Sequence, residues 1–146
     1  MTEAEPVFVD TNVLIYSTRA HSTHHAPACS LLAEREAAAG GMWISSQILR
    51  EFLSAVTRPH PNAAAVPVHE AVRQARFFAR RFWIAEDGPA VFDRLCRLLE
   101  DYPTSGRQVH DANIVATMLA NGITRLLTLN VTDFRRFEGL IAIETA

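Results

Sequence analysis

Four acidic residues occupy positions from which a parallel sheet could gather them at one edge. Asp10 ends the apolar segment PVFV, Asp111 opens the periodic segment HDANIVATML, and Asp133 follows the apolar segment RLLTL. Glu51 lies in SSQILREFL, among residues that favour a helix. Carboxylates held together near neutral pH repel one another unless a cation neutralises them. Oxygen-only ligand sets suit Mg²⁺ or Mn²⁺, and such a site can polarise a phosphodiester and lower the pKa of bound water.

Each of these acids also has an ordinary structural explanation when taken alone. A carboxylate such as Asp111 in the first turn of a helix is favoured by the helix dipole. Asp133 can serve as a turn or capping residue before the segment FRRF. The four acids together are better explained by a metal site. Short polar residues beside them can orient carboxylates or coordinated water, namely Thr11, Asn12, Thr128 and Asn130.

Alternating strand and helix patterns predict the frame that positions these acids. Strands are expected at residues 7–9, 42–45, 82–85, 125–129 and 140–143. Helices are expected over residues 12–18, 68–80, 89–102 and 109–120, from a cap at Ser22 or Thr23 to Ala39, and from a cap at Ser45 or Ser46 to a stop at Arg58. This order predicts one α/β domain over residues 1–146, with a mainly parallel sheet of about five strands. Asp10 then lies at the sheet edge where ligands bind in open parallel sheets.

The composition is that of a globular protein without membrane spans. Hydrophobic residues make up 49% of the chain and charged residues 21%, and no apolar run reaches the length of a bilayer span. The first five residues, MTEAE, are acidic and unlike a secretion signal, so a cytoplasmic location is expected. Cys29 and Cys96 are then expected to be buried thiols rather than a disulfide.

All fourteen basic residues are arginine, and the net charge is −2. The absence of lysine excludes a Walker phosphate loop. Response-regulator receivers and haloacid-dehalogenase-type phosphatases also place an aspartate after a first strand, but these families rely on a lysine. The phosphatases also require a second aspartate two positions after the first, where this chain has Asn12. Both are poor fits to this chain.

The segments VDTNVLIY, SSQILREFL, HDANIVATML and TLNVTDF, in this order, resemble PIN-domain ribonucleases. More narrowly, they resemble a VapC-type toxin of a bacterial toxin–antitoxin pair, from Val7 to about Ile143. The resemblance implies a PIN fold, RNA cleavage dependent on Mg²⁺ or Mn²⁺, a cognate antitoxin protein and a homodimer, which exposed apolar residues of the early helices could serve. It also implies four catalytic and metal-binding acids, Asp10, Glu51, Asp111 and Asp133, with support from Thr128 and Asn130.

Two other functions stay open at this point. One is a PIN nuclease that processes RNA without being a toxin, and the other is a regulatory module whose acids only hold a cation. An antitoxin gene beside this one would separate toxin from processing nuclease, and Mn²⁺-dependent RNA cleavage would separate enzyme from module. No base-reading motif identifies the RNA.

Three further clusters have both a functional and a structural interpretation. His21, His24 and His25 could bind zinc together with Cys29, but the favoured interpretation is that they are solvated loop histidines. His110 precedes Asp111 and could serve as a general acid or base, but a metal-centred mechanism does not need one, so a structural role is expected. An arginine ridge could contact phosphates or an antitoxin, but a solvated face backed by core aromatics is favoured; it comprises Arg73, Arg76, Arg80 and Arg81 with Phe77, Phe78 and Phe82.

Overall fold

The computed structural model describes residues 5–37 and 40–146. A five-stranded sheet forms the centre, in the order β3-β2-β1-β4-β5, and every neighbouring pair of strands is parallel. The expected α/β class with a parallel sheet is confirmed. The strands are β1 (Val7–Val9), β2 (Met42–Ser45), β3 (Trp83–Ala85), β4 (Arg125–Leu127) and β5 (Ala142–Glu144).

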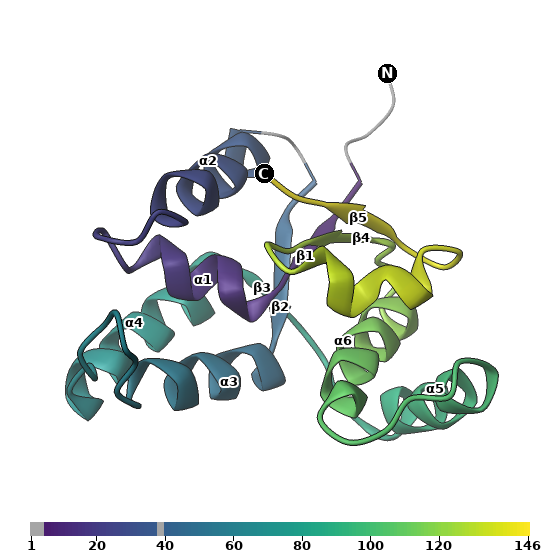
Figure 1. Ribbon diagram of the computed structural model, residues 1–146. Coiled ribbons are helices and arrows are strands. Elements are labelled where there is room, and N and C mark those ends of the chain that lie inside the picture. Colours follow the sequence, from purple (N-terminus) through teal and green to yellow (C-terminus); the bar gives the residue numbers. More distant parts are fainter. Residues whose placement is uncertain (1–4, 38–39) are drawn as a thin grey trace.

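Helices cover both sides of this sheet, as a parallel sheet requires. In Figure 1, α1 to α4 lie on one side of the strands, and α5 and α6 lie on the other. Phe8, Ile44 and Leu126 on the three central strands are fully buried between these layers. The helices are α1 (Thr11–Ser17), α2 (His25–Ala37), α3 (Ser46–Val56), α4 (Val68–Arg81), α5 (Pro89–Asp101), α6 (Gln108–Ala120) and the 3₁₀ helix η1 (Val131–Phe137).

The strand order reverses beside β1, and this reversal creates the place for a site. The chain runs outward from β1 through β2 to β3, and then returns to the opposite side of β1 with β4. In open parallel sheets, ligands bind outside the carboxyl ends of the strands at such a switch point. Asp10 follows β1 there, and its N–H donates to the Leu127 carbonyl at the end of β4 at 2.9 Å.

Element boundaries differ from the sequence expectations mainly at the starts of α2 and β5 and at the end of β4, which is Leu127 rather than residue 129. Helix α2 begins at His25 rather than after Ser22 or Thr23, because residues 22–25 form a turn closed by the His25 N–H and the Ser22 carbonyl. Its expected end at Ala39 lies outside the described residues. Strand β5 begins at Ala142 rather than residue 140, because residues 140 and 141 donate their N–H groups to the Phe137 carbonyl.

Two further expectations concern the burial of the cysteines and the absence of membrane-spanning helices. Cys29 and Cys96 are free thiols, as expected, but both are half-buried rather than buried. Within residues 5–37 and 40–146, no helix combines the length and apolar character needed to cross a bilayer.

Candidate active site

Asp10 is held at the junction of β1 and α1 by three hydrogen bonds. Its Oδ1 accepts from the Thr11 N–H at 2.8 Å. Its Oδ2 accepts from the Thr128 hydroxyl at 2.8 Å and from the Asn12 side-chain amide at 3.3 Å. Only 7% of Asp10 is exposed. The donors come from the start of α1 and from the residue that follows β4, and together they fix the orientation of the carboxylate.

The loop after β4 is tied to the start of α1 by the same polar residues. Asn12 donates to the Thr128 hydroxyl at 3.3 Å and accepts from the Leu129 N–H at 3.1 Å. The Asn130 N–H donates to the Thr128 hydroxyl at 2.9 Å, and the Asn130 amide donates to Asp133. All four polar residues singled out in the sequence thus contact an acid of the predicted site or connect two of them.

Glu51 approaches Asp10 from α3 through a shared neighbour. The Thr11 hydroxyl donates to Glu51 Oε2 at 2.7 Å, while the Thr11 N–H holds Asp10. Gln47, one turn earlier on α3, donates to Glu51 Oε1 at 3.0 Å. Both oxygens of Glu51 therefore have a donor, and each donor comes from a different helix.

Asp111 and Asp133 complete the acidic edge from the other side of the sheet. Asp111 lies in the first turn of α6, and Asp133 in the first turn of η1. The negative charges of Asp133 and Glu51 both act on Asp111, and those of Glu51 and Asp111 both act on Asp10. The structure thus brings Asp10, Glu51 and Asp111 within electrostatic reach of one another, and Asp133 within reach of Asp111, although their catalytic roles stay predictions.

This environment raises the pKa values of Asp10 and Asp111. Burial raises the pKa of Asp10 from 3.8 to about 7; hydrogen bonds from Thr128 and Thr11 lower it, and repulsion by Glu51 and Asp111 adds to the rise. Burial also raises the pKa of Asp111 from 3.8 to about 6, with repulsion by Asp133 and Glu51. The charges of Arg136 and His110 oppose the Asp111 shift. A cluster with raised carboxyl pKa values is typical of a functional site.

The chemistry of these donors fits a hard divalent cation. The side chains offer carboxylate oxygens and no sulfur, which suits Mg²⁺ or Mn²⁺. Among residues 5–37 and 40–146, no three His, Cys, Asp or Glu side chains are gathered tightly enough to hold an ion by themselves. Mg²⁺ keeps several of its waters and is commonly bound through one or two carboxylates, so direct contact with all four acids is not required.

Three polar residues at this edge were missed by the sequence analysis. Gln47 is 5% exposed, and besides Glu51 it donates to the His110 carbonyl at 2.9 Å. Its own oxygen accepts from Asn113 on α6 at 2.7 Å, and Asn113 also donates to Asp87 at 3.2 Å. The spacing of four residues between Gln47 and Glu51 was the available signal, because such residues are neighbours on a helix.

Of the three histidines near α2, only His25 differs from the favoured interpretation of solvated loop residues. His25 begins the helix, and its Nδ1 lies 2.9 Å from the Tyr16 carbonyl. The Cys29 sulfur lies 3.6 Å from His25 Nε2. His21 and His24 are exposed, and His24 packs on the Tyr16 ring at 4.8 Å between centroids.

The arginine ridge lies on the exposed side of α4, apart from the acids. Arg73 pairs with Glu70 at 2.6 Å, and Arg81 pairs with Glu36. The expected core aromatics are only partly found: Phe78 and Phe82 are buried, but Phe77 is 52% exposed.

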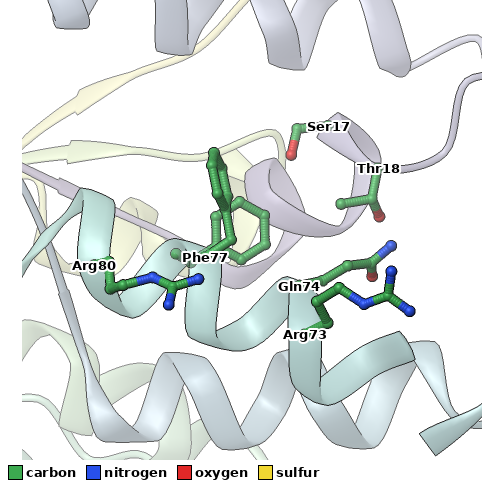
Figure 2. Close-up of a pocket in the computed structure, with 7 residues that line it drawn as sticks. Ser17, Thr18, Arg73, Gln74, Phe77 and Arg80 are labelled. Carbon is green, nitrogen blue, oxygen red and sulfur yellow. The ribbon is translucent and has the colours of Figure 1, made fainter. Parts of the chain in front are cut away.

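A cavity of about 430 Å³ lies between α4 and the end of α1 (Figure 2). Phe77 and Phe78 line it together with polar residues of both helices, Ser17, Thr18, Arg73, Gln74 and Arg80. None of the four acids lines this cavity, so it is separate from the candidate active site.

Comparisons with known proteins concern the fold and the family of this chain. No curated protein matches the chain in sequence. A VapBC2 structure from Rickettsia felis, bound to a promoter DNA fragment, is 22% identical with a TM-score of 0.65, covering 95% of this chain and 97% of the other. A toxin–antitoxin complex from Klebsiella pneumoniae is 21% identical with a TM-score of 0.64, covering 95% and 96%. The sarcin–ricin loop cleaving toxin VapC20 of Mycobacterium tuberculosis is 19% identical with a TM-score of 0.63, covering 82% and 86%.

These structures share the fold of this chain, and each comes from a VapC-type toxin or a toxin–antitoxin complex. The PIN domain family model matches residues 7–140, which includes all four acids. The chain therefore belongs to the PIN-domain family.

Proposed function

We propose that this protein is a metal-dependent endoribonuclease that acts as the toxin of a toxin–antitoxin pair in the cytoplasm. The observation that carries the proposal is the acidic edge at the strand-order reversal, where Asp10 is buried and repelled by neighbouring acids. Membership of the PIN-domain family supports a nuclease. Similarity to a toxin that cleaves the sarcin–ricin loop supports RNA as the substrate class.

The residues of the acidic edge have distinct tasks in this proposal. Mg²⁺ or Mn²⁺, when bound, supplies Lewis-acid polarisation of the phosphodiester and lowers the pKa of water. Asp10 and Asp111 hold the ion, since their mutual repulsion is relieved by a cation. Glu51 and Asp133 contribute the remaining ligands, directly or through water molecules held by the ion. Thr128 fixes the orientation of Asp10, and Asn130 that of Asp133.

The proposal is tested by RNA cleavage with purified protein freed of any partner. Specific cleavage is expected with Mg²⁺ or Mn²⁺, none after EDTA treatment, and recovery when Mn²⁺ is restored. Cleavage by EDTA-treated protein at the rate of the metal-loaded form would refute the metal mechanism. Mn²⁺ binding without cleavage of any RNA would favour a non-catalytic module.

The Asp111→Asn variant separates catalysis from helix capping. A catalytic and metal-binding Asp111 predicts lost cleavage with the fold retained. A capping role predicts the reverse, a loss of about 1 kcal/mol of stability with cleavage retained. The N-cap of α6 is Arg107, whose side chain makes no capping bond, and Asp111 lies further into the first turn.

A protein inhibitor is expected to cover the acidic edge and to place a basic side chain there. An unregulated endoribonuclease would harm its own cell, and an Arg or Lys charge can replace that of the cation. Similar structures include a toxin–antitoxin complex. Expression of this chain alone should arrest growth, and co-expression of the antitoxin should relieve the arrest. A purified partner that binds elsewhere and leaves cleavage undiminished would contradict this part of the proposal.

A further inference from the structure

Gln47 joins the two halves of the acidic edge through its side-chain amide. Its nitrogen donates to Glu51 Oε1 on α3 at 3.0 Å and to the His110 carbonyl on α6 at 2.9 Å. His110 directly precedes Asp111 in the chain. One buried amide group therefore links the carboxylate of Glu51 to the turn that carries Asp111.

The orientation of this amide is set by a chain of partners. The Gln47 oxygen accepts from Asn113 at 2.7 Å, and the second hydrogen of the Asn113 amide goes to Asp87 at 3.2 Å. Asp87 lies in the loop between β3 and α5. Because a carboxylate only accepts, it fixes the Asn113 amide, and Asn113 in turn fixes Gln47. A flipped Gln47 amide would point its oxygen at two acceptors, Glu51 and the His110 carbonyl.

Glu51 is thereby held at both oxygens by groups on different elements. The Thr11 hydroxyl holds Oε2 at 2.7 Å, and the Gln47 amide holds Oε1. Groups that hydrogen-bond a ligating carboxylate fix its direction, and their loss commonly lowers metal affinity or activity by about tenfold to a hundredfold. The part-buried hydrogen bond between Gln47 and Glu51 is placed to have such an effect.

We propose that Gln47 is a positioning residue that fixes Glu51 relative to Asp111, and that Asn113 acts through Gln47. The inference rests on the proposed metal-binding role of the acidic edge, but it does not require that RNA be the substrate. Gln47 does not contact the reacting atoms in this assignment. It sets the geometry in which the acids meet a divalent cation.

The test measures Mn²⁺ binding by calorimetry and the Mn²⁺-induced rise in melting temperature, with MnCl₂ as the probe. Gln47→Met keeps the length of the side chain and removes both donors. We expect its dissociation constant for Mn²⁺ to rise by about tenfold or more, with a smaller Mn²⁺-induced rise in melting temperature. The matched control is Gln74→Met, the same change at a half-buried position on α4 that lines the cavity in Figure 2. This control should bind Mn²⁺ like the wild type.

Asn113→Ala provides a second variant that leaves Gln47 and the acids intact. Alanine is a stronger helix former than asparagine, so the fold of α6 should be retained. We expect weaker Mn²⁺ binding in this variant, and no further loss when it is combined with Gln47→Met, because residues that act through one another are non-additive. Additive losses would show that Asn113 does not act through Gln47.

The outcomes distinguish this inference from the proposed function. A wild-type protein that cleaves RNA, with Gln47→Met binding Mn²⁺ as tightly as wild type, overturns the positioning role alone. A wild-type protein that binds Mn²⁺ but cleaves no RNA overturns the nuclease, while the dissociation constants still decide the role of Gln47. A wild-type protein that binds no Mn²⁺ overturns both.

Discussion

Asp10 is the residue at which the energetic cost of the site is concentrated. Its carboxylate is 7% exposed and lies near Glu51 and Asp111, whose charges disfavour its ionised form. Hydrogen bonds from Thr11 and Thr128 stabilise that form without offsetting the burial. A cluster of mutually repelling acids that includes one buried carboxylate is unfavourable in the metal-free protein. The cluster becomes favourable when a cation neutralises it.

This arrangement predicts how stability depends on pH in metal-free protein. The pKa of Asp10 is about 7 in the folded state against an ordinary value of 3.8, and that of Asp111 is about 6. Between pH 4 and pH 7 the folded state keeps protons that the unfolded chain has released. Their stabilisation is complete below about pH 4 and is lost as pH rises. For Asp10 the slope is at most about 1.4 kcal/mol per pH unit.

Urea unfolding of the wild type and Asp10→Asn in EDTA measures this slope. The wild type should lose more stability than Asp10→Asn between pH 4.5 and pH 7.5, and saturating Mg²⁺ should reduce the difference. Equal slopes for the two proteins would mean that Asp10 does not hold the raised pKa.

The sequence predicted the acids and the short polar residues beside them, but not Gln47 and Asn113. Asp10, Asp111 and Asp133 lie at the ends or starts of strongly patterned segments, and Glu51 is the one acid within such a segment, SSQILREFL. Residue type and position therefore both indicated these acids. Gln47 carries no charge, and its bond to the His110 carbonyl joins residues 63 apart in the chain. Such a contact depends on how α3 and α6 pack, which local patterns do not specify.

At the scale of elements, local signals succeeded where a side chain or an apolar run defines a boundary. Strands β1 and β2 match the expected residues, and Ser45 caps α3 with a side-chain bond from the Ile48 N–H. The misses fall at a local turn and on the exposed side of α4. Strand β5 begins late because the preceding residues close the end of η1, and Phe77 is exposed on α4 although its pattern suggested the core.

The cap of α3 also positions Glu51, which lies on this helix. Ser45→Ala removes the side-chain acceptor of the Ile48 N–H, a bond of 3.5 Å. A loss of about 1 kcal/mol in the free energy of unfolding is expected. Ser54→Ala on the exposed side of the same helix is the matched control and should change stability by less than about 0.5 kcal/mol. Equal effects of the two changes in urea unfolding would contradict the capping role.

At the scale of the whole molecule, the order of the strands decides where the site lies. Residues from the start of α1, from α3, from α6 and from the loop after β4 meet only because β4 returns beside β1. The alternation of strands and helices predicted a parallel sheet, but it did not predict this order. The order comes from how the helices pack on the two faces.

The homodimer stays a prediction, but the surface that could form its interface differs from the one expected from the sequence. The large exposed apolar side chains of the described residues lie on or beside α4, β3 and α5 rather than on the early helices: Val68, Phe77, Trp83, Ile84 and Phe92. Light scattering should give a mass of twice the 16.2 kDa chain at micromolar concentration. A mass of one chain at every concentration would rule out the homodimer.

The central claim is that the acidic edge is a metal-dependent site for RNA cleavage. The most direct measurement compares RNA cleavage by wild type and Asp10→Asn at saturating Mn²⁺, with melting temperatures of both proteins in EDTA. Asparagine keeps the shape of Asp10 and removes one charge from the repelling cluster. Cleavage should fall by about a hundredfold or more, while the EDTA melting temperature equals or exceeds that of the wild type. An Asp10→Asn protein that cleaves RNA within a few-fold of the wild-type rate would contradict the account.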